Sequence, residues 1–372
     1  MRNMSGEFDP AAELGLFPDK TFVCNCRGFI TKNDAVRDLC DRFIRNGGHF
    51  YDVLRRYDEL TAYVLGREEA TGASCIKWAI PFLKAFGATD HLMHQYSKET
   101  MELMPNAART MNYISKILPT FITSSMYEHT MMEVMESLDA PLCETFCSKA
   151  EMDQADFGRA ESRKIREMAQ EIASLRIPKV EYKLNVPMEV HADDIKIIRT
   201  LDDILQERIP QLSAMNLMES LTIVTAHKKA YQLLDIRRQT SIDLDSTFYI
   251  GGEQSDYQAM DLVRDSGGMA VAFNGSEYAV RGCNIAILSK ESTVGAVFAA
   301  EFYDKGLQAV LDLASNWERK YLKNADVHDV NLMQAMLKEN PRKLPEVYIV
   351  DRKNVDEISE KSDAYRRKLL GI

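Results

Sequence analysis

The chain has 372 residues, of which 45% are hydrophobic, so it is long enough for one large domain with insertions or for two domains, and it can bury a sizeable core. Its formal net charge is -10 at pH 7. An acidic chain is not expected to be a general nucleic-acid binder, because affinity for the phosphate backbone depends on clustered Lys and Arg.

The N-terminal residues and the cysteine content bear on the compartment. No apolar run approaches the ~20 residues that a membrane-spanning helix needs. Residues 1–15 carry acidic side chains and lack the apolar segment of a secretory signal. Seven cysteines, an odd number, are not typical of a secreted disulfide framework. We therefore expect a cytoplasmic protein without a membrane span.

Two closely spaced cysteine pairs raise the question of a metal site. They are Cys24 with Cys26 and Cys143 with Cys147. Neither pair has the C-x2-C spacing or the histidine partners of an ordinary zinc site, and free cysteines are among the most buried residue types. Packed thiols are the favoured interpretation, and soft-metal binding is the alternative.

The first half of the chain contains a strand, an insertion and a second pair of strands. A short apolar run at residues 20–29 predicts a buried strand that enters a loop at Gly28. Apolar residues three and four apart then predict a helical cap insertion over residues 33–104. Strands at 119–125 and 142–147 flank the next helical pattern, and the change to charged helical segments marks a second insertion over residues 151–220.

The second half alternates between strands and helices. Further strands are predicted at residues 246–251, 269–273 and 284–288. This alternation predicts an α/β fold with a mainly parallel sheet and helices on both faces, whose ligands bind beyond the carboxyl ends of the strands. The core would comprise residues 18–32, 105–150 and 221–320, followed by a C-terminal helical extension over residues 321–372.

Residues 249–287 contain a strand, an acidic loop, a helix and a strand that ends in the turn Asn274-Gly275. They resemble the C-terminal core motif of haloacid-dehalogenase-like (HAD-like) phosphatases, in particular an archaeal-type branch with some members labelled energy-converting hydrogenase subunit R-like. Upstream, the strand that ends near Gly28, the Thr123-Ser124 pair and the Lys228-Lys229 pair follow in the family's order. The resemblance implies a HAD-like Rossmannoid core, and it does not cover the two insertions.

The resemblance also implies a chemistry, which this sequence carries only in part. Such enzymes use an aspartate nucleophile after the first strand, an acid two residues later and a carboxylate-bound Mg²⁺. Carried over residue by residue, the nucleophile position is Asn25 and the acid position is Arg27. An amide is a poor nucleophile, and a guanidinium neither releases a proton at pH 7 nor binds a cation. Gly252 stands where the family has an acid. Glu253 could supply the missing carboxylate only if the loop shifted. Asp256 alone is an insufficient metal site.

These replacements reverse the charge expected of the site. With carboxylates at the replaced positions, the family site would sum to about -3, whereas the residues present sum to about +1. A phosphate or carboxylate ligand could then bind directly, through Arg27, Lys229 and the hydroxyls of Thr123 and Ser124. The alternative is a structural salt bridge between Arg27 and Asp256 that leaves no ligand site.

Cys26 lies in the same loop as Arg27, and a basic neighbour can lower the pKa of a thiol. We keep Cys26 as a candidate reactive residue. A cysteine phosphatase, however, needs an arginine about six residues after its thiol, and the residue at that distance from Cys26 is Lys32.

Two functions remain open from the sequence. The favoured one is a HAD-like protein that has lost standard Mg²⁺-dependent phosphatase activity and acts as a binding, regulatory or scaffolding module, with an anionic ligand or a protein partner and without a cofactor. The other is an unusual phosphohydrolase that uses Asp256 or Glu253, with Lys229 and Mg²⁺. Neither the substrate nor the oligomeric state follows from the sequence.

Overall fold

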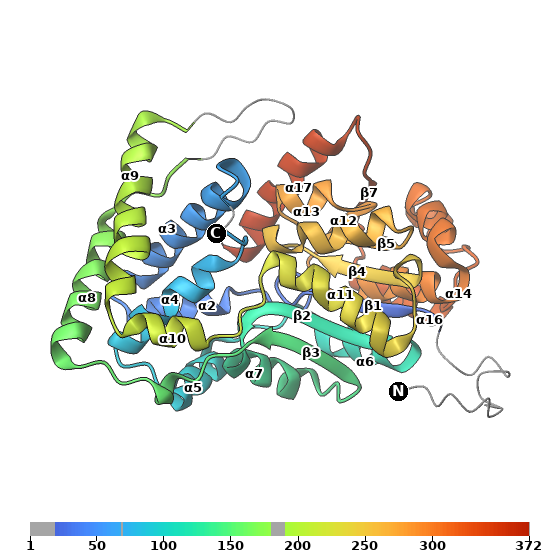
Figure 1. The fold of residues 1–372 in the computed structure, drawn as a ribbon. Helices are drawn as coiled ribbons and strands as arrows, with labels where there is room; N and C mark the ends of the chain where they lie inside the picture. The colour runs from blue at the N-terminus through green and yellow to red at the C-terminus, as the bar shows by residue number, and fades with distance from the viewer. Residues whose placement is uncertain (1–18, 68–69, 180–189, 372) are drawn as a thin grey trace, which may run out of the picture.

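The computed structural model describes residues 19–67, 70–179 and 190–371 (Figure 1). No helix in these ranges is long and apolar enough to cross a membrane. Residues 1–15, where we expect no secretory signal, lie outside the described part of the chain.

Described strands form one seven-stranded sheet in the order β3-β2-β1-β4-β5-β6-β7. Their bounds are β1 Thr21–Cys24, β2 Thr120–Tyr127, β3 Cys143–Ser148, β4 Thr247–Gly251, β5 Met269–Phe273, β6 Ile285–Leu288 and β7 Glu346–Ile349. All neighbours pair in parallel except β6 and β7. All six predicted strands are present, but β1 ends at Cys24, so Asn25 and Arg27 lie in the loop beyond its carboxyl end.

Helices cover both faces of the sheet (Figure 1). Alternate strand residues point to opposite faces: Phe22 and Cys24 of β1 belong to one hydrophobic core, and Val23 belongs to the other. The first core is completed by α6 Ala107–Ile117, α7 Glu128–Leu138, α14 Thr293–Ser315 and α16 Val330–Glu339. The second is completed by α11 Ala226–Thr240, α12 Tyr257–Asp265, α13 Glu277–Arg281 and α17 Val355–Leu370.

The two predicted insertions lie together on one side of the molecule (Figure 1) and share a third hydrophobic core. Its elements are α2 Ala35–Phe43, α3 Gly47–Glu59, α4 Ser74–Ala85, α8 Arg159–Ser174, α9 Ala192–Asp202 and α10 Ala214–Ser220. Helix α5, Asp90–Thr100, packs beside α2 and α7. The predicted α/β fold, with a mainly parallel sheet, helices on both faces and helical insertions, is confirmed.

The C-terminal helical extension predicted over residues 321–372 also includes one strand. The segment contains β7, which adds an antiparallel edge to β6. Its sequence, EVYI, has strand-forming residues, but the Lys- and Glu-rich residues around it hid this signal. Helices α16 and α17 lie in this segment, and α15, Arg319–Leu322, crosses its start. Helix α17 reaches the candidate site.

Candidate functional site

The candidate site lies where the loops after β1 and β4 meet at the carboxyl edge of the sheet. The β1 loop turns at Gly28, whose φ of 90° lies in the left-handed region that favours glycine. The β4 loop leads into the short 3-10 turn η6, Gln254–Asp256. Asn25 Nδ2 donates a hydrogen bond to Asp256 Oδ2 at 2.9 Å. The two loops therefore come together as the sequence predicted.

The carboxylate of Asp256 is fully buried and surrounded by donors. Besides Asn25, its Oδ2 accepts from the backbone N–H groups of Gly252 and Glu253, each at 2.8 Å. Its Oδ1 accepts from Lys229 Nζ at 2.6 Å and from the hydroxyl of Tyr249 at 3.0 Å. These contacts occupy the oxygen atoms that a metal ion would need.

Lys229 lies in the first turn of α11, and Thr225 caps this helix by accepting a hydrogen bond from the backbone N–H of Lys228. Its ammonium group also donates to Ser255 Oγ at 3.0 Å. Lys229 and Asp256 are both 0% exposed, so the lysine charge is balanced within the protein. The sequence predicted that Lys229 binds an anion. In the structure, the carboxylate of Asp256 is the anion that its ammonium group contacts.

The predicted alternative salt bridge between Arg27 and Asp256 is wrong, because Lys229 already pairs with Asp256. Arg27 instead reaches the cap. Its Nη1 lies 2.8 Å from Asp34 Oδ2 and 3.3 Å from Glu253 Oε1. Asp34 is held in place as the residue that caps the N-terminus of α2.

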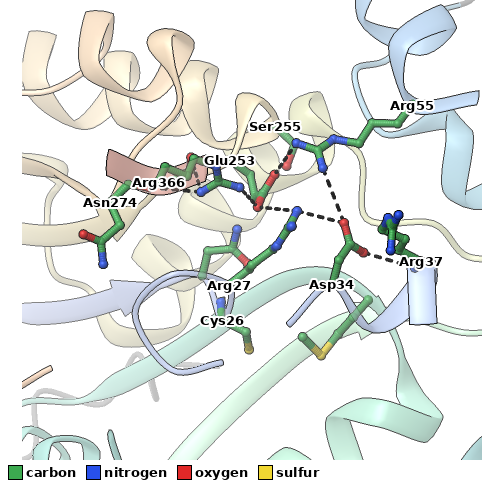
Figure 2. A network of polar contacts seen from close by, with 12 residues as sticks. Cys26, Arg27, Asp34, Arg37, Arg55, Glu253, Ser255, Asn274 and Arg366 are labelled. Atoms are coloured by element: carbon green, nitrogen blue, oxygen red, sulfur yellow. Dashed lines mark hydrogen bonds and ion pairs between the residues drawn. The ribbon is translucent and has the colours of Figure 1, made fainter. Parts of the chain in front are cut away.

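Two arginines that the sequence did not point to complete this network (Figure 2). Arg55 of α3 lies 3.5 Å from Asp34 Oδ2 and 3.9 Å from Glu253 Oε2. Arg366 of α17 pairs with Glu253 and donates to the carbonyl oxygens of Gly252 and Asn274 at 3.2 and 3.0 Å. Burial favours the neutral form of Glu253, but the charges of Arg366, Arg27 and Arg55 outweigh it and hold the pKa of Glu253 well below its ordinary value.

The hydroxyl pair on β2 is divided between two environments. Thr123 Oγ1 donates to Gln232 Oε1 of α11 at 2.5 Å, so this hydroxyl is used between the sheet and a helix. Ser124 points to the other face and lines a cavity together with Asn25 and Arg27. Of the two predicted hydroxyl ligands, only Ser124 lines this cavity.

The cavity, of about 80 Å³, lies between the β1 loop, the start of α2, α3 and the end of β2. Arg27 lines it and is 8% exposed. Within the described part of the chain, the buried Nε and Nη2 atoms of Arg27 have no hydrogen-bond partner. Buried charged donors of this kind usually have a partner, so a bound water or anion is the expected complement.

The backbone around Gly252 leaves no room for the acid expected there. A Cβ atom at this position would lie 2.7 Å from the carbonyl oxygen of Phe273 and 3.4 Å from Arg366 Nη1. The first distance is below ordinary contact, and the carbonyl belongs to the rigid sheet. An aspartate would fit only if the backbone moved.

The donor set does not fit Mg²⁺. Among the described residues, no group of three or more His, Cys, Asp and Glu is arranged to hold a metal ion. The carboxylates nearest the expected position are Asp256 and Glu253, and each is engaged by cationic side chains. Mg²⁺ needs free oxygen ligands and a negative site.

The cysteines of the β1 loop and β3 are free thiols. Burial raises the pKa of the Cys26 thiol to about 12, so at neutral pH Cys26 lacks the thiolate that a nucleophile needs. This geometry favours packed thiols and argues against the reactive role that we kept open.

Comparison with known proteins bears on the fold. No protein-family model matches the chain, and no curated protein matches it either. The solved structure of the gene product AF1437 from Archaeoglobus fulgidus is similar over 95% of this chain and 97% of its own, with a TM-score of 0.76 and 20% identity. This similarity shows that the α/β core and the insertions form one known fold over almost the whole chain.

More distant similarities are to HAD-family enzymes. The alignment with a phosphoserine phosphatase, solved as a phospho-aspartyl intermediate analogue, covers 73% of this chain and 95% of the phosphatase chain, with 9% identity and a TM-score of 0.43. A HAD family hydrolase from Salmonella enterica serovar Typhi covers 71% of this chain and 72% of its own, with 12% identity and a TM-score of 0.40.

Proposed function

We propose that the protein is a HAD-like protein in which the phosphoryl-transfer site has become a metal-independent binding site for a small oxyanion. The observation that carries this proposal is the division of the charged residues. Lys229 and Asn25 hydrogen-bond to the carboxylate of Asp256. Arg27 lines a cavity, and two of its own nitrogen atoms, Nε and Nη2, have no hydrogen-bond partner among the described residues. A regulatory or scaffolding role would follow from the binding of such a ligand.

Loss of standard hydrolysis follows from the same geometry. The amide of Asn25 stands at the nucleophile position and is hydrogen-bonded to Asp256. Arg27, at the position of the acid, has no proton to give at pH 7. Removal of a covalent nucleophile commonly costs several orders of magnitude in rate. We therefore expect no turnover of generic phosphate esters above background with Mg²⁺.

The unusual phosphohydrolase has less support. It would use the carboxylates of Asp256 or Glu253 with Lys229. Lys229 and Asp256 form a fully buried ion pair, and Glu253, which is 17% exposed, pairs with the buried Arg366. A general base needs a free lone pair within hydrogen-bond reach of the attacking group. Turnover that is lost in Asp256→Asn but retained in Asn25→Ala would nevertheless favour this enzyme.

Ligand-induced thermal shifts test the binding proposal. The unfolding temperature is measured with acetate, phosphate, sulfate and chloride at matched ionic strength, with and without Mg²⁺. A ligand that binds only the folded state raises this temperature by mass action. We expect a shift with an oxyanion, none with chloride and no further gain with Mg²⁺.

Two arginine variants supply the control. Arg27→Gln should remove the ligand-induced shift, whatever its effect on the unfolding temperature without ligand. Arg56→Gln is the matched change, because Arg56 pairs with Glu59 and does not line the cavity, and it should keep the shift. A response that is flat for every anion, or equal in both variants, would rule out the proposed site.

A further inference from the structure

The walls of the cavity divide into a polar end and an apolar end. Arg27, Asn25, Asn33, Ser124 and Ser125 supply the polar groups. The apolar wall consists of buried side chains from α2, α3, α4 and the end of β2, namely Val36, Tyr51, Ala73, Cys75, Ile76 and Met126. A bare inorganic oxyanion would leave this apolar wall without a complementary group.

The salt-bridge network that contains Arg27 leaves room for one negative charge. Three guanidinium groups, those of Arg27, Arg55 and Arg366, face two carboxylates, those of Asp34 and Glu253. Lys229 and Asp256 cancel each other. A singly charged anion would neutralise the network, whereas a dianion would bring an uncompensated negative charge into a buried site.

The volume of the cavity limits the ligand further. An engineered apolar cavity of about 150 Å³ holds benzene. The cavity here measures about 80 Å³ and is open on one side, so on the same scale it holds roughly three non-hydrogen atoms, and the rest of a ligand would extend toward the opening. A nucleotide or a sugar phosphate is several times too large for it.

We infer that the ligand is a small organic monoanion, with an oxyanion head at Arg27 and a short aliphatic group against Val36 and Ile76. The inference rests on the proposed function and names the class of its ligand. Short-chain carboxylates and alkylsulfonates share this chemistry. Sulfate is a dianion and phosphate is mainly a dianion at pH 7.5, and neither carries an apolar group.

A pair of anions of nearly equal shape tests this class. Methanesulfonate differs from sulfate in having a methyl group in place of one oxygen atom. It therefore carries one negative charge, whereas sulfate carries two. Their affinities for the wild-type protein are measured by calorimetry at pH 7.5 and matched ionic strength. We expect methanesulfonate to bind at least tenfold more tightly than sulfate or phosphate.

A carboxylate series measures the apolar end separately. Each methylene group that fits should increase affinity roughly fourfold, so propionate should bind more tightly than acetate. Pentanoate should bind no better than acetate, because it exceeds the cavity. A series in which affinity rises without a limit, or does not depend on chain length, would contradict a small apolar pocket.

Val36→Thr places a hydroxyl in the apolar wall with little change in volume. We expect it to reduce the preference for methanesulfonate over sulfate to threefold or less. Val53→Thr is the matched control, because Val53 is buried in the same helical core but does not line the cavity; it should keep the preference. If Val36→Thr does not fold, the wild-type anion series still decides the matter.

The binding measurements distinguish a failure of this inference from a failure of the proposed function. If phosphate or sulfate binds as tightly as methanesulfonate, the ligand class is wrong and the oxyanion site stands. If no anion binds, both are wrong. Tight methanesulfonate binding that depends on Arg27 and on Val36 supports both.

Discussion

At the scale of single residues, the ion pair between Lys229 and Asp256 closes the position of the expected metal. Lys229→Met leaves the Asp256 carboxylate buried without its cation. Removing one partner of a buried pair costs about 3–5 kcal/mol, and we expect a loss of this size in the free energy of unfolding measured with urea. The double variant Lys229→Met with Asp256→Asn should recover part of it; a single variant as stable as the wild type would contradict the role of the pair.

Asp58 in α3 predicts a pH dependence of stability that originates in the cap. The side chain has no exposed surface, and burial raises its pKa from 3.8 to about 7. The folded state therefore holds a proton that the unfolded chain has released. Stability falls as the pH rises from about 4 and continues to fall until the pH passes about 7.

Asp58→Asn removes this effect while keeping the size of the side chain. We expect the variant to gain stability over the wild type as the pH rises, by about 2–3 kcal/mol more at pH 8 than at pH 5. Urea unfolding at both pH values measures the difference. A difference between the two proteins that is the same at both pH values would show that Asp58 does not titrate in this way.

At the scale of elements, α17 locks the acidic loop after β4. Arg366 is 1% exposed and joins Glu253 to two backbone carbonyl groups. Arg366→Met should lower the free energy of unfolding by about 3–5 kcal/mol, because Glu253 loses a buried partner. Arg367→Met is the matched control: this neighbour is 58% exposed and pairs with Asp363 on the surface, so its loss should cost about 1 kcal/mol or less. Equal effects of the two variants would contradict the locking role.

The elements were largely predictable from the sequence, and the site was predictable only in part. Apolar runs and strand-helix alternation marked the sheet, and the ordered motifs brought Asn25 and Asp256 together. Arg55 and Arg366 lie on charged helices far from the motifs in sequence, and no local pattern distinguishes them from surface arginines. The predicted Arg27–Asp256 alternative was wrong because a count of charges does not say which cation reaches which carboxylate.

At the scale of the whole molecule, the cavity lies at the junction of cap and core. Asp34 and Arg55 come from the first insertion, Glu253 from the β4 loop and Arg366 from the last helix (Figure 2). Cap and core also meet where Tyr63 donates to the carbonyl of Gln254 at 3.2 Å. Segments far apart in the chain thus contribute to one network of charges beside the cavity, and the tertiary fold alone determines the balance of these charges.

A crystal structure of the protein grown with methanesulfonate and Mg²⁺ tests the central claim, a metal-independent oxyanion site, most directly. We predict density for the anion in the cavity, with its oxygen atoms within hydrogen-bond distance of Arg27, and an unchanged contact between Lys229 and Asp256. Mg²⁺ bound to Asp256, with Lys229 displaced and the cavity without an anion, would contradict the account.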